Sequence, residues 1–599
     1  MQLTSFDWLI IAAYFLFNLS IGVYYSRRAR GSTSEFFLSG RHIPWWLAGT
    51  SMVATTFAAD TPLAVTGFVA RNGIAGNWLW WNFVMSGMLT VFLYARLWRR
   101  AGVMTDVEFA ELRYSGKPAA FLRGFRALYL GLPINCIILG WVNLAMIKIL
   151  RITLGLDDRN ATYVLIGMLV FTAFYTAISG LWGVLVTDLF QFALKMGMVI
   201  LLAVLAVKAV GGIDALKMKI AAIDAATGQS GSRLAFFPEL DSAWMPALTL
   251  FVYLAVNWWA TWYPGAEPGG GGYVAQRIFS AKDEKHGLLA TLWFNIAHYA
   301  LRPWPWILTA LASLVLYPEL ADKEAGYIRT LMDPNVFPPY LRGFMLAAFA
   351  AAYMSTIGTQ LNWGASYVIN DFYRRFAVRD RSERHYVIAS QAVTLMLMAL
   401  SLIVTFNLDS IGGAWKLLLV TGAGTGTVLL LRWFWWRINA WSEVSAMAAA
   451  AVVSLYLQLY WKWDSDQPRD FAYLMLVTVG ITTAVWLAAT FLTAPEPLDQ
   501  LIRFYRRVRP EGPGWKRIAA EAGVTDKNLS GGLAAQFANW VLGCVLIYAS
   551  LFGIGKLIFK EWGIGLIFAV LAVAAAMLIS WNMTGTRAKA NTVHLTRNS

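Results

Sequence analysis

Apolar runs long enough to cross a lipid bilayer recur along the whole chain, and they restrict it to a membrane fold. The hydrocarbon core of a bilayer is about 30 Å thick, which a helix of about 20 apolar residues spans. Hydrophobic residues make up 58% of the 599 residues and charged residues only 14%, whereas soluble domains are about 25% charged. Because backbone groups in lipid must be satisfied internally, we expect an all-α, multi-pass membrane protein with about fifteen transmembrane helices. The expected spans lie near residues 7–26, 45–70, 78–98, 121–150, 162–179, 183–209, 245–280, 286–317, 341–373, 385–406, 411–436, 442–461, 470–492, 533–557 and 562–582.

Basic residues gather in alternate loops, and this pattern predicts the orientation. Clusters that include Arg27, Arg99, Arg374 and Arg506 follow the first, third, ninth and thirteenth expected spans. Loops rich in Lys and Arg stay on the cytoplasmic side. We therefore expect the N-terminus outside and the C-terminus in the cytoplasm. The membrane would be a plasma membrane, or the inner membrane if the source is a Gram-negative bacterium.

The same loops account for the net charge of +15. The basic stretch 493–532 is interpreted as a collar at the membrane surface, where anionic lipid attracts Lys and Arg. We therefore expect membrane lipid and a small-molecule solute as partners, and no nucleic acid. The sequence leaves the oligomeric state open.

Two of the expected spans contain residues that interrupt a helix. The stretch "SMVATTFAADTPLAVTG" (51–67) carries an acid, hydroxyls and a proline, and "WWATWYPGAEPGGGGYVAQR" (258–277) carries Pro264, Pro268 and four consecutive glycines. Proline removes a backbone donor, and each glycine costs about 1 kcal/mol in a helix. Non-helical backbone at membrane depth survives only where protein buries it or a wet cavity accepts it.

The two interrupted spans are the first members of two successive five-span units, which run inverted across the membrane because five is odd. Breaks at corresponding places in inverted repeats indicate a transporter binding site. Kinks made for packing alone are the alternative, but both breaks carry an acid, Asp60 and Glu267. The expected organisation is an N-terminal anchor helix and cytoplasmic loop (1–44), a first repeat (45–244), a second repeat (245–437) and peripheral helices (438–599).

A third segment, "LAAFAAAYMSTIGTQLNWGASYVINDFY" (346–373), places small and hydroxyl side chains on one helix face. Ala352, Ser355, Thr356 and Thr359 follow i, i+3, i+4, i+7 spacing. Such hydroxyls often bond back to the carbonyl four residues earlier. Beside an interrupted helix with free carbonyls, an ion site becomes the favoured interpretation.

Four motifs occur in order: "STSEFFLSGRHIPWWLAGTSMVATTFAAD" (32–60), "YTAISGLWGVLVTDLFQ" (175–191), "YVAQRIFSAKD" (273–283) and "AAFAAAYMSTIG" (347–358). With them, about residues 5–437 resemble the sodium/solute symporter family, which includes sodium–glucose, sodium–proline and sodium–sialic acid transporters. The resemblance implies the inverted-repeat fold of the leucine transporter and alternating access driven by a sodium gradient.

The resemblance also implies a main Na⁺ site, with Na⁺ as the coupling ion. Its ligands would be backbone carbonyls of Ala54, Phe57 and Ala352 and the hydroxyls of Ser355 and Thr356. Oxygen ligands of this kind suit a hard cation.

Some members of the family bind a second sodium. Here it would use Asp188 and Thr359, but Gly358 stands where those members have a hydroxyl. A salt bridge of Asp188 is an equally open interpretation.

The solute cavity should lie between the two breaks and the third span. The sugar-binding positions of the family do not transfer intact, since Trp80 and Asn295 replace an acid and a lysine. Aromatic faces with a few amides and carboxylates still suit a polyol. If Arg302 pairs with Asp60 or Glu267, a neutral or zwitterionic solute is favoured; if it does not, a carboxylate fits. The candidate solute-binding residues are Asp60, Thr61, Trp80, Asn257, Trp258, Trp262, Glu267 and Asn295.

We therefore expect a secondary active transporter, not an enzyme, that performs sodium-coupled symport of a small polar organic solute, with a sugar-like solute favoured. A sodium-coupled amino acid or carboxylate symporter, or a proton-coupled relative, is the alternative. A membrane sensor or a channel fits less well, because the sequence predicts neither a soluble signalling domain nor a continuous polar stripe.

Overall fold

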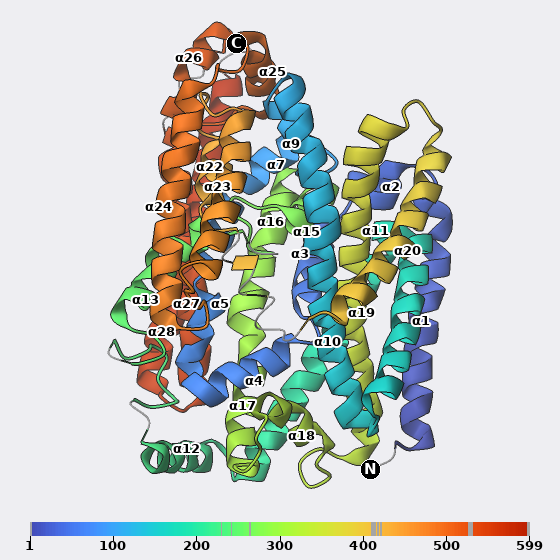
Figure 1. The fold of residues 1–599 in the computed structure, drawn as a ribbon. Coiled ribbons are helices and arrows are strands. Elements are labelled where there is room, and N and C mark those ends of the chain that lie inside the picture. The colour runs from blue at the N-terminus through green and yellow to red at the C-terminus, as the bar shows by residue number, and fades with distance from the viewer. Residues whose placement is uncertain are drawn as a thin grey trace.

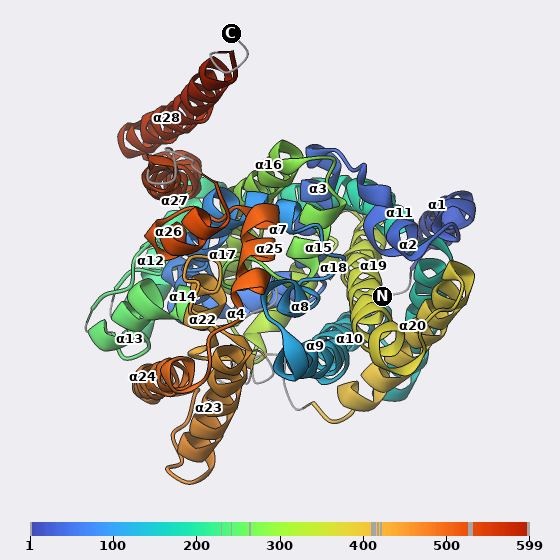
Figure 2. The same cartoon turned by 90° about the horizontal axis from the view of Figure 1, so that it is seen from above.

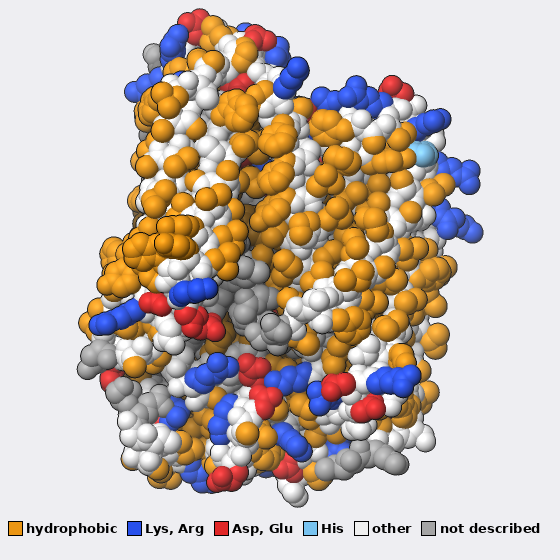
Figure 3. Space-filling view, in the orientation of Figure 1, with side chains coloured by type: hydrophobic (Ala, Val, Ile, Leu, Met, Phe, Trp, Pro, Cys, Tyr) orange, Lys and Arg blue, Asp and Glu red, His pale blue; other side chains and the backbone are white. Residues whose placement is uncertain are grey.

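The computed structural model describes residues 3–228, 231–240, 242–262, 265–408, 415, 418–419, 422–524 and 531–595, with Gly531 and 585–595 as backbone only. Throughout these ranges the regular elements are helices, which confirms the all-α class. Figure 1 shows an upright bundle in which most long helices run roughly parallel or antiparallel. A broad band of hydrophobic side chains covers the face of the bundle seen in Figure 3, with charged side chains gathered above and below it. This distribution is the one that a bilayer requires.

The first part of the chain forms α1 (Ser5–Ala29), α2 (Thr33–Leu38), α3 (Trp45–Thr56), α4 (Thr61–Asn72), α5 (Trp78–Trp81), α6 (Val84–Leu89), α7 (Ala95–Ala101), α8 (Phe109–Arg113), α9 (Gly116–Tyr129), α10 (Asn135–Leu154), α11 (Asp158–Val210) and α12 (Ile213–Thr227). The next part forms α13 (Ala247–Val252), α14 (Trp258–Ala260), α15 (Gly272–Ser280), α16 (Glu284–Asn295), α17 (Pro303–Leu316), α18 (Gly326–Met332), α19 (Arg342–Ser366) and α20 (Glu383–Thr405). The last part forms α22 (Thr425–Leu431), α23 (Ala440–Leu459), α24 (Pro468–Leu492), α25 (Leu498–Val508), α26 (Lys516–Glu521), α27 (Gly531–Ile558) and α28 (Trp562–Leu595).

Short turns connect several of these helices. π-helical turns are η3 (Thr90–Tyr94), η4 (Leu130–Ile134), η5 (Tyr253–Asn257), η6 (Ile296–Leu301) and η9 (Tyr367–Ala377). Tighter 3₁₀ turns are η1 (Ser39–Arg41), η2 (Ile74–Asn77), η7 (Lys323–Ala325), η8 (Pro339–Leu341) and η10 (Pro513–Trp515). π turns break the regular hydrogen-bond ladder and often occur at functional sites.

The described residues contain 10 helices long and apolar enough to cross a membrane, or up to 11 if the bent pair α3–α4 counts as one span. The expected count of about fifteen is not confirmed. One reason is that the expected spans 162–179 and 183–209 together form α11, divided only by Gly180, whose φ is 56°. Another is that 245–280 is made of short helical pieces, and that much of 411–436 lies outside the described residues.

Both expected interruptions occur. Helix α3 ends at Thr56 because Phe57 leaves the helical region, and α4 starts at Thr61 with Pro62 in its first turn, where proline is well tolerated. The two halves are bent by 59°. In the second segment α14 ends at Ala260 and α15 starts at Gly272; Pro264 lies outside the described residues.

Helix α11 packs against α1, α3, α17 and α19. Helices α23 and α24 form one outer pair and α27 and α28 another, and Figure 2 shows both pairs at the rim. The interrupted helices therefore lie between long scaffold helices, which bury their non-helical backbone.

Candidate functional site

The break between α3 and α4 exposes carbonyl groups that the side chain of Lys195 contacts. The Lys195 Nζ atom donates to the Ala54 carbonyl at 2.8 Å and to the Phe57 carbonyl at 3.2 Å. The same Nζ lies 5.1 Å from the centre of the Phe57 ring. Lys195 belongs to α11 and is only 1% exposed. Two carbonyls expected to face sodium therefore accept hydrogen bonds from an ammonium group.

The hydroxyl face of α19 lies beside this break, as its spacing predicts. Thr356 Oγ1 donates to the Thr55 carbonyl at 2.7 Å and lies 3.2 Å from the Ala352 carbonyl. Ser355 Oγ donates to Asp188 Oδ1 at 2.6 Å. The structure thus brings the five expected ligands of the main site into one region, and each hydroxyl has a partner within the protein.

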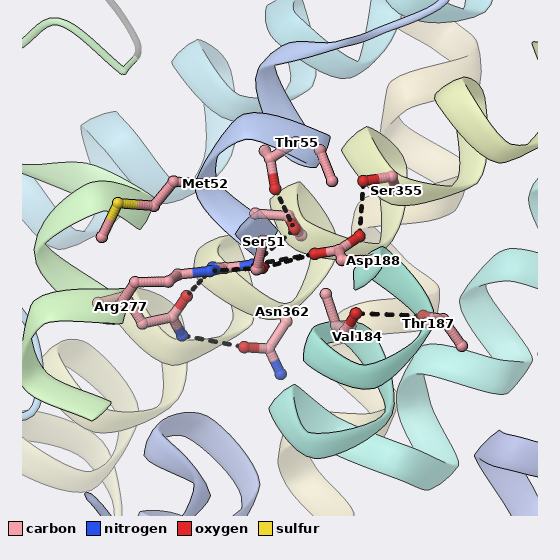
Figure 4. A network of polar contacts seen from close by, with 12 residues as sticks. Ser51, Met52, Thr55, Val184, Thr187, Asp188, Arg277, Ser355 and Asn362 are labelled. Carbon is pink, nitrogen blue, oxygen red and sulfur yellow. Dashed lines mark hydrogen bonds and ion pairs between the residues drawn. The ribbon is translucent and has the colours of Figure 1, made fainter. Parts of the chain in front are cut away.

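Asp188 is the centre of a second buried network, shown in Figure 4. Its other oxygen, Oδ2, accepts a hydrogen bond from Ser51 Oγ at 2.5 Å, and Arg277 Nη2 lies 4.0 Å from it. Arg277 also donates to Ser51 and, at 2.8 Å, to Thr359 Oγ1. Asp188 and Thr359, the expected ligands of a second sodium, are therefore joined through one guanidinium.

Gly358 stands where a second hydroxyl would complete that site, and close packing explains the glycine. A Cβ atom at this position would lie 3.0 Å from Thr176 Oγ1 on α11. Such a distance is tighter than ordinary van der Waals contact, so a larger side chain would push α19 and α11 apart.

A cavity with about 820 Å³ of empty volume lies next to the break. Asp60, Thr61 and Trp80, three of the candidate solute-binding residues, line it. Asp60 is buried, and its Oδ1 atom has no hydrogen-bond partner among the described residues. A buried polar atom without a partner is unfavourable unless a ligand or water satisfies it. Asp60 is therefore a point of this wall where a hydrogen bond from a solute would be favourable.

Aromatic and basic side chains form the rest of the wall. The Trp80 indole stacks on the Tyr299 ring at 5.7 Å and meets the His298 ring edge-on. Arg302 also lines the cavity; its Nη1 donates to Thr56 Oγ1 at 3.0 Å, and its charge faces Asp60. Further aromatic residues of the lining are Phe68, Phe83, Trp141, Tyr273 and Trp415.

The other candidate solute-binding residues are not among those that line this cavity. Asn257 donates to Asn82 Oδ1 at 3.1 Å, Trp258 packs on Trp540, and Asn295 donates to the Thr291 carbonyl. Trp262 lines a separate apolar cavity with about 1190 Å³ of empty volume. These side chains fell in the expected spans, but the helices turn them toward packing contacts.

Glu267 lies at the second break, next to the start of α15. Its Oε2 accepts a hydrogen bond from the Gly265 amide at 3.1 Å, and a Cβ on Gly272 would lie 2.5 Å from its Oε1. Asp106 is the acid that faces it. Of the two acids considered as partners of Arg302, Asp60 lines the same cavity as Arg302, whereas Glu267 is not among the residues that line it.

Sequence reasoning missed Lys195 and the role of Arg277. A signal for Lys195 was present, because an isolated lysine in an apolar span follows Asp188 at i, i+7 spacing and therefore shares its face. Arg277 belongs to the motif "YVAQRIFSAKD" (273–283), which in the sequence supports only the resemblance to the family. Its guanidinium reaches the centre because α15 runs beside α3 and α19.

The fold, the two breaks and the buried network define a transporter of the inverted-repeat class. The chain belongs to the sodium:solute symporter family, whose pattern it matches over residues 36–450. Members of this family are transporters that span the membrane many times.

Individual relatives are distant but extend over most of the chain. The chain is 24% identical over 483 residues to the sodium/glucose cotransporter of Vibrio parahaemolyticus, covering 76% of this chain and 86% of the relative. It is 25% identical over 575 residues to sodium/glucose cotransporter 1 of Oryctolagus cuniculus, covering 86% and 83%.

Among solved structures, a substrate-bound, outward-open Na⁺-coupled sialic acid symporter matches with a TM-score of 0.66 and 20% identity. The match covers 82% of this chain and 99% of that one. At this identity the match establishes the fold.

Proposed function

We propose that the protein is a secondary active symporter that carries a small, polar, sugar-like solute across a plasma membrane by alternating access. The observation that supports this most strongly is the cavity between α4, η6 and the first break. It combines an acid, Asp60, whose Oδ1 atom has no hydrogen-bond partner among the described residues, with stacked aromatic rings, Trp80 and Tyr299. The family and its sodium/glucose relatives support sodium as the coupling ion of the group.

A polyhydroxylated solute matches these groups. Aromatic faces contact the apolar face of a sugar ring, while a carboxylate accepts hydrogen bonds from its hydroxyls. The N-terminus would lie outside and the C-terminus in the cytoplasm, with solute and membrane lipid as partners.

A zwitterionic amino acid is the second candidate, and the placement of Arg302 opposite Asp60 favours it. The guanidinium would bind a carboxylate and the acid an ammonium group. A simple monocarboxylate is less favoured, because the Asp60 carboxylate would repel it.

The test is a thermal-unfolding screen of the purified protein against sugars, polyols, amino acids and monocarboxylates, followed by uptake into proteoliposomes. A ligand that binds the folded state raises its apparent stability. We expect stabilisation by a sugar or polyol and its loss in Asp60→Asn. Stabilisation by amino acids alone would select the second candidate, and uptake that needs no imposed gradient would contradict active transport.

A further inference from the structure

The cation that contacts the break in α3–α4 belongs to the protein. Of the carbonyls expected to face sodium, two accept hydrogen bonds from Lys195 and the third, of Ala352, lies 3.2 Å from the Thr356 hydroxyl. The Ser355 hydroxyl, a further expected ligand, donates to Asp188. These expected sodium ligands therefore already form hydrogen bonds with side chains of the protein.

The geometry of Lys195 is that of a built contact. Its stem leaves α11 on the face of Asp188, passes the Phe57 ring, and delivers an ammonium to the carbonyl end of α3. The carbonyl end of a helix carries a partial negative charge and attracts cations. An ammonium has three N–H donors, and two of them are directed at the Ala54 and Phe57 carbonyls.

Charges around Lys195 also disfavour a further cation. From its own helix Asp188 faces it, and Arg302, between η6 and α17, does so as well, with His298 one turn earlier in η6. Arg277 of α15 reaches Asp188. Tyr14 of α1 contacts Gln191, one turn before Lys195. The residues of α3, α4 and α19 that line the small hollow at Lys195 are uncharged.

Within this group the positive side chains Lys195, Arg277 and Arg302 outnumber two acids, Asp188 and the Asp60 carboxylate that Arg302 faces. A sodium ion at the same carbonyls would lie within a few ångströms of the Lys195 ammonium, where like charges repel strongly in a medium of low dielectric constant. The residues present do not fit a sodium ion at this position while Lys195 holds it.

We infer that the Lys195 side chain replaces the main coupling sodium of the family, so that the break in α3–α4 is held by a fixed ammonium and does not take sodium from solution. This inference rests on the proposed function for its meaning in transport. Its structural claim, that Lys195 excludes sodium, is tested without any solute.

The experiment compares thermal unfolding of the purified protein in sodium chloride and in choline chloride at constant ionic strength and pH. The variant is Lys195→Met, which keeps the length of the stem and removes the charge. The matched control is Lys217→Met, because Lys217 also donates to a backbone carbonyl, that of Phe559, at 3.1 Å, far along the chain from the break.

We expect wild type and Lys217→Met to unfold at the same temperature in both salts. Lys195→Met should become specifically stabilised by sodium, with an apparent sodium affinity at least tenfold above that of the wild type. Adding Thr356→Ala to Lys195→Met should remove most of that gain, since it deletes an oxygen at the same position.

Equal sodium responses of wild type and Lys195→Met would overturn the inference. So would a sodium response of the wild type that Ser355→Ala plus Thr356→Ala abolishes. If Lys195→Met does not fold, Lys195→Gln and the wild-type arm decide the same question. Failure of every solute to bind, with the sodium results as expected, would contradict the proposed function and leave Lys195 as the resident cation.

Discussion

Both interrupted helices carry an acid at the break, Asp60 and Glu267, but at the first break a cation also contacts the end of the preceding helix. At the first break, α3 ends in carbonyls that meet the Lys195 ammonium. At the second break, α15 begins next to the Glu267 carboxylate, which accepts the Gly265 amide. Helix C-termini favour cations and helix N-termini favour anions. The comparison teaches that the polarity of the broken end, more than the break itself, selects the charge placed there.

The two breaks also differ in how their backbone is held. The first is short, from Phe57 to Asp60, and opens onto the cavity. The second is long and contains Gly269, Gly270 and Gly272 at φ values of 75°, 81° and 55°, which only glycine adopts easily. Trp98 pins this run by donating its indole N–H to the Gly269 carbonyl at 2.7 Å.

The largest expected effect comes from reversing the charge at the first break. Lys195→Glu places a carboxylate against two carbonyls and beside Asp188, without a partner. An uncompensated buried charge costs about 3–5 kcal/mol, so we expect the protein to unfold at a much lower temperature or to fail to accumulate. Fluorescence-detected thermal unfolding in detergent measures this, with Lys217→Glu as the matched reversal. A loss no larger than that of Lys217→Glu would show that the charge of the α3 end is unimportant.

The next effect concerns Asp60, the acid on the cavity side of the first break. Asp60→Asn should weaken solute binding by about tenfold to a hundredfold, because hydrogen bonds to a charged group contribute about 1.5–3 kcal/mol. The loss of stability without solute should be smaller than this loss of affinity, since Oδ1 has no partner within the described residues, although Arg302 faces the carboxylate. Isothermal titration or the thermal-shift curve gives the affinity. A stability loss with unchanged affinity would make Asp60 a structural residue.

A smaller effect is expected at the second break. Trp98→Phe removes the indole N–H that donates to the Gly269 carbonyl and keeps most of the aromatic volume. Leaving a buried carbonyl without a partner costs about 1–3 kcal/mol. Trp540→Phe is the control, because Trp540 donates to the Met85 carbonyl at 2.8 Å from a less buried position. Unfolding temperatures of the two variants that agree would mean that Trp98 does not hold the glycine run.

The sequence predicted the class of fold and the places of both breaks, because proline, glycine and apolar length act locally. It also placed Ala352, Ser355 and Thr356 on one face beside α3, since helical periodicity is independent of the partner. It did not predict which side chain meets the freed carbonyls. That depends on the rotation of α11, which brings Lys195 to α3 only through long-range packing.

The same limit explains the solute-binding candidates. Asp60, Thr61 and Trp80 line the cavity, whereas Asn257 donates to Asn82 and Asn295 bonds back to the Thr291 carbonyl of its own helix. A π turn precedes Trp258 and another follows Asn295. Each π turn shifts the faces of a helix by part of a turn, so regular spacing could not place these side chains.

The smallest expected effect is the coupling between the two breaks through Glu267 and Arg302. Sequence reasoning left open a pair between these charges, for which Glu267→Gln and Arg302→Gln would be strongly non-additive. In the structure Glu267 accepts the Gly265 amide and faces Asp106, while Arg302 donates to Thr56 and faces Asp60. Separate sites usually add within about 0.5 kcal/mol. We therefore expect a double-mutant cycle on thermal stability to give a coupling below this limit.

Asp60→Asn with Arg302→Gln is the matched cycle and should exceed that limit, because a charge and its facing acid are changed together. A coupling of Glu267 to Arg302 as large as that of Asp60 would mean that the two breaks share one charge system, and that their opposite polarities are not set independently by the helix ends.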